Sequence, residues 1–448
     1  MNAIRSVLVS VGVAAAAAGC TSWQRVGTQA GATPEGALLQ LFNPAELYRS
    51  LDRMVSTSGV PFIATSAVLP GPAAGQRVVV GVSLTNRALS FTRADDHFLA
   101  RYRVEYTLSR SGAEPITASR EAVVRVPTMQ ETLRTDETLL LQHELHAPAG
   151  DYLLTVRLAD RTSNEVGIAT DSITVPPFGP GSFTQPMLVY EVRGRAERGD
   201  SVGIILNPRG SIAFGGDTLL IYLEGVGYST PTRVPLQVLD ASDSVVFRTA
   251  VEFTAQREIE SQIIRLTPDS APLGPLRVVI GEGSSARQVA GVVSFSGNWL
   301  ITNFDDLLSL LRYFGEDNRI GKMRDATPES RPELWREFFA STDPNKLTPE
   351  NEALDAYFAR LSVANDLFRD EGIAGWRTDR GEVYVSLGPP DEVYDATPMQ
   401  SGRFIRWAYY DYRISLIFQD QSGFGRYRLG GESRSEFERV KARVQRSR

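Results

Sequence analysis

The chain has 448 residues, with 53 acidic and 47 basic side chains and a formal net charge of −6. This mildly acidic balance argues against nucleic-acid binding, which calls for a strongly basic face. The hydrophobic fraction of 42% is ample for packed cores, and the length predicts about three domains at the usual size of roughly 150 residues each.

The amino terminus has the three parts of a secretory signal. Arg5 supplies a positive charge, residues 7–18 are apolar, and small residues precede Cys20. The apolar stretch is shorter than the ~20 residues that span a bilayer. The run Ala17-Ala18-Gly19-Cys20 resembles the lipobox of bacterial lipoproteins, in which the cysteine is acylated before cleavage in front of it. The resemblance implies a signal peptide over residues 1–19 and lipidation of Cys20.

Cys20 is also the only cysteine, so no internal disulfide can form. Acylation would leave no free thiol to oxidise, whereas an ordinary soluble signal with a chance cysteine is the alternative. Ser22 resembles the sorting signal of outer-membrane lipoproteins. We therefore expect an exported protein that is anchored to the cell envelope by lipid, at the outer membrane.

Residues 20–61 predict a tether followed by a short helix. The first part is rich in Gly, Ala and Thr without apolar periodicity, which is typical of a flexible linker. Asn43 can cap the helix, whose apolar face contains Leu47, Leu51 and Met54.

Two β-sandwich modules follow, of the immunoglobulin-like antiparallel kind. Short alternating runs separated by turn residues predict the first over residues 62–177 and the second over 184–297. Consecutive prolines at Pro176-Pro177 mark the linker between them. The predicted strands are Arg77–Leu84, His97–Ser109, Ile116–Val126, Thr138–His146, Gly150–Ala159, Ser172–Val175, Leu188–Val192, Leu219–Val226, Arg233–Leu239, Ser244–Phe253, Gln262–Leu266, Leu276–Ile280 and Val289–Phe295.

The pattern changes to helical periodicity at Asn303 and predicts a small helix-plus-antiparallel-sheet domain over residues 300–432. The fold class is therefore mainly β with a carboxy-terminal α+β domain. Residues 433–448 predict a basic tail that can form a polar helix from Arg434, either solvated or in contact with anionic lipid or a partner. Helices are expected at Phe304–Leu311, Leu334–Phe339 and Pro349–Arg369, and strands at Glu382–Leu387, Phe404–Asp411, Arg413–Gln419 and Gly425–Leu429.

One motif in this last domain is specific. The stretch Gly375-Trp376-Arg377-Thr378-Asp379-Arg380-Gly381 is followed by Gly388-Pro389-Pro390-Asp391-Glu392, and Trp407 and Tyr409 come downstream. These residues resemble the signature of the GWxTD domain family of bacterial exported proteins, over residues 331–430. The resemblance implies no activity and no catalytic residues, so the catalytic residues stay unknown.

The motif has two interpretations. As structure, it is a helix-to-strand junction in which Gly375 and Gly381 allow positive φ and Trp376 anchors the core. As a binding site, its charged side chains converge into a groove rimmed by aromatic residues, a composition that recognition surfaces favour. The groove would contain Arg377, Asp379, Arg380, Asp391, Glu392, Trp376, Trp407 and Tyr409.

Neither a metal nor a cofactor is expected. His97, His143 and His146 are the only histidines, and His143 and His146 lie on a predicted strand at a spacing that faces them apart. The glycine-rich loop 281–286 lies between two strands, so it lacks the helix amino terminus of a dinucleotide site.

We therefore expect a binding protein that presents its GWxTD-like domain to a protein, peptide or glycan partner. One alternative is an envelope hydrolase using two carboxylates among Asp379, Asp391 and Glu392, which would face one cleft at roughly 5 to 10 Å. The other is a structural subunit of an envelope assembly, which would show a broad apolar patch.

Overall fold

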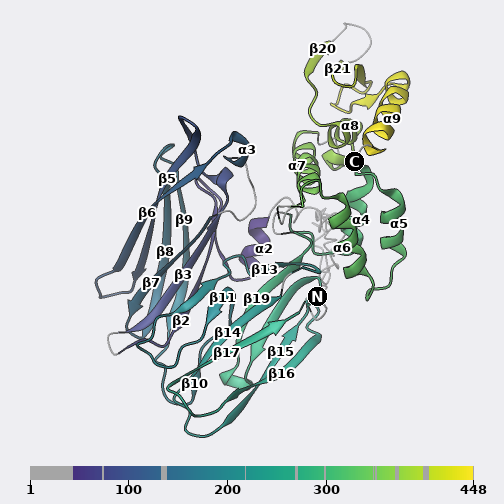
Figure 1. Cartoon of the computed structure of the whole chain (residues 1–448). Helices are drawn as coiled ribbons and strands as arrows, with labels where there is room; N and C mark the ends of the chain where they lie inside the picture. The colour runs from purple at the N-terminus through teal and green to yellow at the C-terminus, as the bar shows by residue number, and fades with distance from the viewer. Residues whose placement is uncertain are drawn as a thin grey trace, which may run out of the picture.

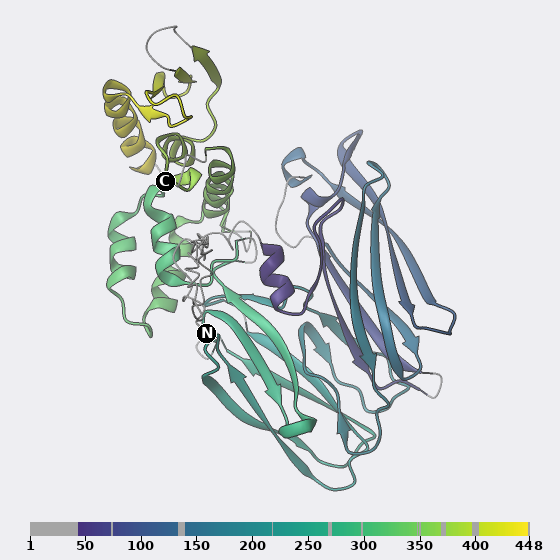
Figure 2. The ribbon, with the colours of Figure 1, turned by 180° about the vertical axis from the view of Figure 1, so that it is seen from behind.

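The computed structural model describes residues 44–72, 75–132, 139–216, 218–267, 271–296, 299–346, 348, 351–368, 373–396 and 403–446. The predicted signal peptide, Cys20, the tether and the helix cap Asn43 lie outside these residues. Two β-sandwiches lie side by side, and a carboxy-terminal region of helices and a small sheet projects from them (Figures 1 and 2). Within the described residues, no helix is long and apolar enough to cross a membrane.

The first helix is shorter than the sequence predicts. Helix α2 covers Pro44–Ser50, and Met54 already belongs to strand β1 (Met54–Ser56), where it pairs with Ala64. The change of direction occurs at Asp52, whose φ of 57° is left-handed and ends the helical path.

The first sandwich contains two sheets. One has the strand order β1-β2-β3-β7, and the other has the order β4-β5-β8-β9 with β6 also pairing with β5. Alternate residues of both sheets point inward and form one apolar core. The remaining elements are β2 (Phe62–Leu69), β3 (Gln76–Leu84), η1 (Asn86–Ala88), β4 (Thr92–Ala94), β5 (His97–Ser109), β6 (Ile116–Val126), α3 (Met129–Thr132), β7 (Leu139–Ala147), β8 (Gly150–Asp160) and β9 (Val166–Val175).

The second sandwich has the same two-layer plan. One sheet has the order β10-β14-β11-β12 with β17 pairing with β14, and the other has the order β13-β19-β18-β15-β16. Only the β13–β19 pair is parallel among the described ladders of this module. Its elements are β10 (Ser182–Phe183), β11 (Met187–Arg193), β12 (Gly203–Leu206), β13 (Ser211–Ala213), β14 (Leu219–Val226), β15 (Thr232–Leu239), β16 (Val245–Phe253), β17 (Ile259–Leu266), β18 (Gly274–Ile280), η2 (Gly283–Ser285) and β19 (Arg287–Ser294).

Strand β3 is buried on both faces because it lies between the modules. Val78 and Val80 point into the first core, while Val79 packs against Leu206 and other apolar residues of the second module. A Cβ on Gly81 would lie 3.1 Å from the Leu206 Cβ, so glycine lets the two modules approach closely. The continuous valine run of this strand thus reflects a buried contact between modules.

The carboxy-terminal region has one core that runs from Phe295 to Phe437. Helices and a four-stranded sheet of order β20-β21-β22-β23 surround it. Together with the two sandwiches, this arrangement confirms the predicted fold class. The elements are α4 (Phe304–Leu310), η3 (Leu311–Tyr313), α5 (Asp317–Asp325), α6 (Arg331–Thr342), α7 (Glu352–Leu367), η4 (Gly375–Arg377), α8 (Asp379–Leu387), β20 (Glu392–Ala396), β21 (Arg403–Tyr409), β22 (Ile414–Asp420), β23 (Arg428–Leu429) and α9 (Gly431–Arg446).

The predicted strand Glu382–Leu387 is wrong, because these residues belong to helix α8. Thr378 caps this helix by accepting a hydrogen bond from the Gly381 N–H, and Gly388 ends it with a φ of 92°. The two end signals and burial of Val383 outweigh the β-propensity of the valines and tyrosine in between.

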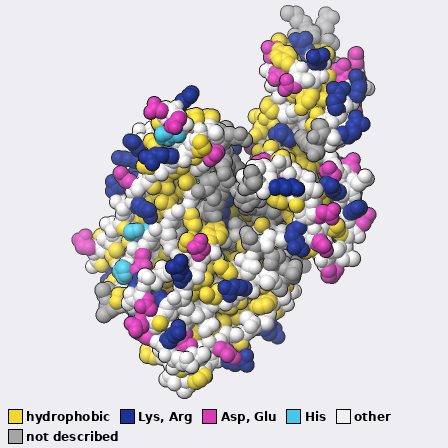
Figure 3. All heavy atoms as spheres, viewed as in Figure 1, with side chains coloured by type: hydrophobic (Ala, Val, Ile, Leu, Met, Phe, Trp, Pro, Cys, Tyr) yellow, Lys and Arg dark blue, Asp and Glu magenta, His cyan; other side chains and the backbone are white. Residues whose placement is uncertain are grey.

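Helix α9 is an integral part of this region, although the sequence places it in a separate tail. Phe437 and Val440 are buried in the common core. Lys and Arg side chains gather on the outer side of the region where α9 lies, whereas charges of both signs are interspersed over the visible faces of the sandwiches (Figure 3). The basic composition therefore belongs to the exposed face of an amphipathic packed helix.

Candidate functional site

The two glycines of the motif permit close packing of α7, η4 and α8. A Cβ on Gly375 would lie 2.4 Å from the Ala364 carbonyl oxygen in α7. A Cβ on Gly381 would lie 2.0 Å from the Gly375 carbonyl oxygen. Neither glycine has positive φ, so the predicted reason for them is wrong. Their role is to leave space for backbone that a side chain would occupy.

Thr378 and Trp376 hold the same turn in place. The Thr378 hydroxyl donates to the Gly375 carbonyl at 2.7 Å and accepts from the Gly381 N–H at 3.0 Å. Trp376 is fully buried against Tyr313, as expected of a core anchor. Its indole Nε1 has no hydrogen-bond partner among the described residues. The motif therefore joins helix α7 to helix α8, and the predicted helix-to-strand junction is wrong.

Asp379 is engaged in a network that ties α8 to α9 and β23. It accepts a hydrogen bond from the Leu429 N–H at 2.7 Å and lies 3.0 Å from the Arg434 guanidinium. Arg434 and Lys441 both pair with Glu382, at 2.9 and 2.7 Å. Burial lowers the pKa of Arg434, but hydrogen bonding to Glu382 and the charges of Asp379 and Glu382 raise it overall. This network compensates both carboxylates.

The motif arginines lie over aromatic rings. The Arg377 guanidinium is 4.9 Å from the Trp376 ring centroid. The Arg380 guanidinium is 4.5 Å from that of Tyr427 and 5.2 Å from that of Phe368. These cation–π contacts cover the edge of the core.

Asp391 and Glu392 start the sheet. The Tyr410 N–H donates to the Asp391 carboxylate at 2.6 Å, and the Asp391 N–H donates to the Ala408 carbonyl. The Tyr394 hydroxyl donates to the Glu392 carboxylate, and this bond is the main cause of a lowered pKa of Glu392. Asp391 thus fixes the β20–β21 ladder.

The predicted aromatic rim is not formed by Trp376, Trp407 and Tyr409. All three side chains are buried in the core. Trp407 packs on Phe418, and the Tyr409 hydroxyl donates to the Gly388 carbonyl. The motif residues thus serve packing, ion pairs and the sheet, with the aromatic side chains buried and Arg377, Asp391 and Glu392 exposed.

The sequence did not single out the opposite, solvent-facing side of the sheet. Register places Tyr394, Arg406 and Ile417 in one row across β20, β21 and β22. Tyr394 is 43% exposed and Ile417 44% exposed, and Tyr410 next to this row is 59% exposed. The Arg406 guanidinium lies 4.2 Å from the Tyr394 ring centroid. Strand alternation opposite the buried Trp407 is the signal that could have identified this row.

We name Tyr394, Arg406, Tyr410 and Ile417 the outer face. Among the described residues, no carboxylate lies within ion-pair distance of Arg406, and no group of three or more His, Cys, Asp or Glu side chains could hold a metal ion. The outer face therefore offers an exposed cation, two tyrosines and one aliphatic side chain, with the exposed Glu392 carboxylate bonded to the Tyr394 hydroxyl on the same face. Its chemistry is that of recognition.

Comparison with known proteins identifies the region. The family model of the GWxTD domain matches residues 279–430, from within β18 to the residue before α9. Among solved structures, the calcium binding domain CBD12 of CALX1.1 is 15% identical over 58% of this chain and 85% of that chain, with a TM-score of 0.14. CBD12 from CALX1.2 is 14% identical over 46% and 72%, also with a TM-score of 0.14. Comparison with curated proteins gives no match.

Proposed function

We propose that this chain, which carries a GWxTD domain, is a lipid-anchored binding protein of the bacterial envelope that presents the outer face of its carboxy-terminal sheet to a protein partner. The observation that carries the proposal is the exposed row of Tyr394, Arg406 and Ile417, with Tyr410 beside it. Tyrosine and arginine dominate binding energy at protein interfaces. The Tyr394 ring also holds the Arg406 side chain, which lowers the entropy lost on binding.

The carboxylates of the motif support binding over hydrolysis. A general acid or base must reach a substrate, yet Asp379 and Asp391 each accept a hydrogen bond from a backbone N–H, and Asp379 also pairs with Arg434. The two carboxylates thus fix local backbone.

The partner is expected to place a carboxylate against Arg406. Arg406 is exposed and no carboxylate of the described residues lies within ion-pair distance of it, although its charge helps to lower the pKa of Glu392. A partner acid would therefore add charge complementarity without displacing a direct ion pair. A broad apolar contact is not expected, because the row alternates between aromatic, cationic and aliphatic side chains.

The test is recovery of partners from detergent-solubilised native membranes with a carboxy-terminal tag on the full chain. Wild type is compared with the double variant Tyr394→Ala/Arg406→Ala and with the matched control Arg439→Ala, an exposed arginine on α9. We expect a co-purifying protein whose recovery falls at least about tenfold in the double variant and is unchanged in the control. Equal recovery of the partner with the wild type and both variants would exclude the outer face as the contact.

The anchor is tested in the same cells. Cys20→Ser should abolish incorporation of a labelled fatty acid and move the protein to the soluble fraction, because the proposed membrane attachment is the lipid on this residue. Unchanged labelling or fractionation would remove the anchor from the proposal.

A further inference from the structure

A cleft of about 820 Å³ lies between the two sandwiches. Its wall comes from the first module at β2 and β9, from the second module at the segment before β11 and the start of β19, and from the turn after α2. This volume falls within the roughly 300 to 1,000 Å³ of small-molecule sites, which often lie between domains. The side chains used below are Asp52, Arg53, Thr65, Asp171, Ser172 and Gln185.

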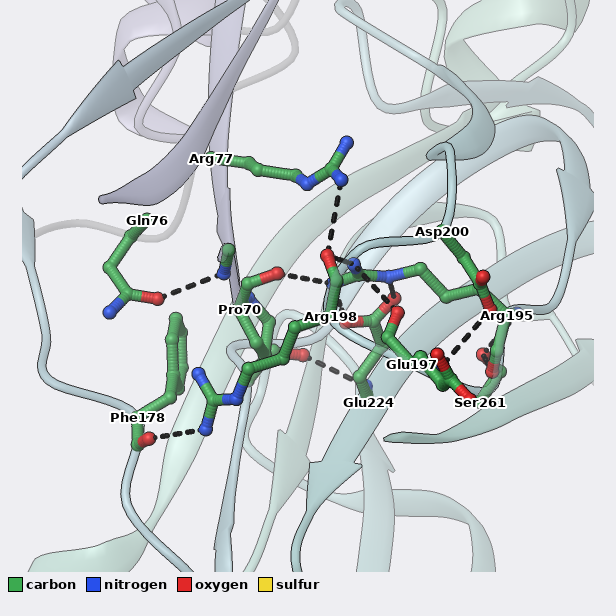
Figure 4. Close-up of polar contacts among 12 residues, drawn as sticks. Pro70, Gln76, Arg77, Phe178, Arg195, Glu197, Arg198, Asp200, Glu224 and Ser261 are labelled. Atoms are coloured by element: carbon green, nitrogen blue, oxygen red, sulfur yellow. Dashed lines mark hydrogen bonds and ion pairs between the residues drawn. The ribbon is translucent and has the colours of Figure 1, made fainter. Parts of the chain in front are cut away.

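The cleft is preformed, because the modules are locked together beside it. The Arg195 guanidinium pairs with Glu224 at 2.7 Å, and both side chains are almost fully buried. The same guanidinium donates to the Pro70 carbonyl of the first module at 2.6 Å, and Arg77 of the first module donates to the Arg198 carbonyl (Figure 4). A site built on a locked interface loses little free energy to reorganisation when a ligand binds.

Arg53 is the unusual group in the wall. It is only 8% exposed, yet no carboxylate pairs with it among the described residues. Two hydrogen bonds are made by its guanidinium, to the Ala290 carbonyl at 2.7 Å and to the Thr65 hydroxyl at 3.3 Å. Its Nε has no partner in the described part of the chain. A guanidinium has five N–H donors, so several stay available.

The surroundings are built to hold this guanidinium. A Cβ on Gly210 would lie 2.2 Å from its Nη2, so the guanidinium packs directly against the backbone of this glycine, whose φ is 60°. Burial lowers the pKa of Arg53 to about 10, and the charge of Asp52 offsets only part of this effect. A buried charge without a counter-charge is costly, and a bound anion would remove that cost.

The rest of the wall specifies more than an anion. Thr65, Ser172 and Gln185 add hydroxyl and amide groups. Asp171 lines the cleft as well, and its pKa is raised by burial and by the charge of Asp52. A carboxylate in the wall disfavours a simple anion, but it accepts hydrogen bonds from hydroxyl groups on the same ligand.

We propose that the cleft binds a small hydroxylated acid, with Arg53 holding its carboxylate or phosphate group. Arginine binds both groups through charge-assisted, often bidentate hydrogen bonds. The hydroxyl groups of the ligand contact Thr65 and Asp171. This site is separate from the outer face, so it does not depend on the proposed protein partner.

The experiment is calorimetric titration of the full mature chain in detergent with glucuronate, glucose 6-phosphate and glucose. We expect at least one of the two acids to bind, and glucose to bind at least about tenfold more weakly because it has no group for Arg53. Whichever of the two acids binds more tightly shows whether the site prefers a carboxylate or a phosphate group. Failure of both acids to bind, or equal binding of glucose, would overturn the proposal.

Variants locate the binding. Arg53→Gln should weaken binding of the acid at least about tenfold. Because this variant removes a bond to Ala290 and could unfold the chain, Ser172→Trp provides a second test by filling the cleft from an exposed strand position. Its matched control is Ser119→Trp, at an exposed position of β6 in the same sheet and outside the lining of the cleft. Loss of binding in Ser172→Trp alone supports the site, and equal binding in both tryptophan variants contradicts it.

Discussion

The charged side chains of the GWxTD motif have ion-pair partners, whereas the buried arginine of the inter-module cleft has none among the described residues. In the motif, Asp379 and Glu382 are matched by Arg434 and Lys441, at distances of 2.7 to 3.0 Å. In the cleft, Arg53 is more deeply buried and has no ion-pair partner among the described residues. An ion pair is explained by the fold that it stabilises. A buried charge without a pair is costly, and a bound ligand of opposite charge would remove that cost. The comparison therefore favours Arg53, which lies outside the motif, as a ligand-binding residue.

The largest effect is expected from creating a second uncompensated arginine. Glu224→Gln leaves the Arg195 guanidinium buried without its counter-charge, and only one acceptor oxygen remains where the carboxylate offers two to Arg195 and Tyr222. Loss of one partner of a buried pair costs about 3 to 5 kcal/mol, so the free energy of unfolding should fall by that amount. Urea unfolding measures it.

The matched control is the exposed pair of Arg233 and Glu252, at 2.7 Å with side chains 75% and 60% exposed. Glu252→Gln should change the free energy of unfolding by less than about 1 kcal/mol. If both variants cost the same, burial would not set the cost of an unpaired charge in this protein, and the argument for a ligand at Arg53 would weaken.

A smaller effect is expected from the motif glycines. Gly381→Ala places a methyl group against the Gly375 carbonyl, so helix α8 must shift, at a cost of about 1 to 3 kcal/mol. Gly321→Ala is the control, because Gly321 lies in helix α5 with no described atom within 4 Å of an added Cβ. That change should stabilise the protein by up to about 1 kcal/mol. Thermal unfolding distinguishes the two, and a neutral Gly381→Ala would contradict the packing role of the motif.

Strand positions could be predicted well from the sequence, because alternation and turn residues are local signals. His97–Ser109 and Ile116–Val126 match β5 and β6 at both ends. Prediction failed where distant residues decide the outcome. The segment Glu382–Leu387 has strand-like composition, but its cap and its contacts with α7 make it a helix.

The same limit applies to the candidate sites. The motif could be located from the sequence, but the main partners of Asp379 come from Arg434 and Leu429, about 50 residues later. Arg53 follows an aspartate in what resembles a surface turn, and only the arrangement of the two modules buries it. Burial of a charged residue is a property of tertiary structure, so no local pattern indicates it.

The smallest expected effect concerns stability in acid. The pKa of Asp420 in the carboxy-terminal sheet is lowered, whereas the pKa of Asp171 in the cleft is raised. Burial raises the pKa of Asp420, but hydrogen bonds from Ser422 and from the N–H groups of Gly425 and Gly423 outweigh it and lower the pKa overall. A lowered pKa in the folded state adds stability above the unfolded value of about 3.9, and this contribution is lost as the pH falls through the folded pKa. Asp171 has a raised pKa, so its contribution increases as the pH falls.

Asp420→Asn should therefore reduce stability at neutral pH and flatten the loss of stability below about pH 4, since an amide does not titrate. Asp171→Asn should do the reverse and make the protein slightly more stable at neutral pH, because it removes a carboxylate whose charged form is disfavoured. The free energy of unfolding measured in urea between pH 3 and pH 7 tests both signs. If both variants only shift the curve of unfolding free energy against pH without changing its shape, neither carboxylate is linked to folding. The contrast between the paired charges of the motif and the unpaired charge of the cleft would then rest on Arg53 alone.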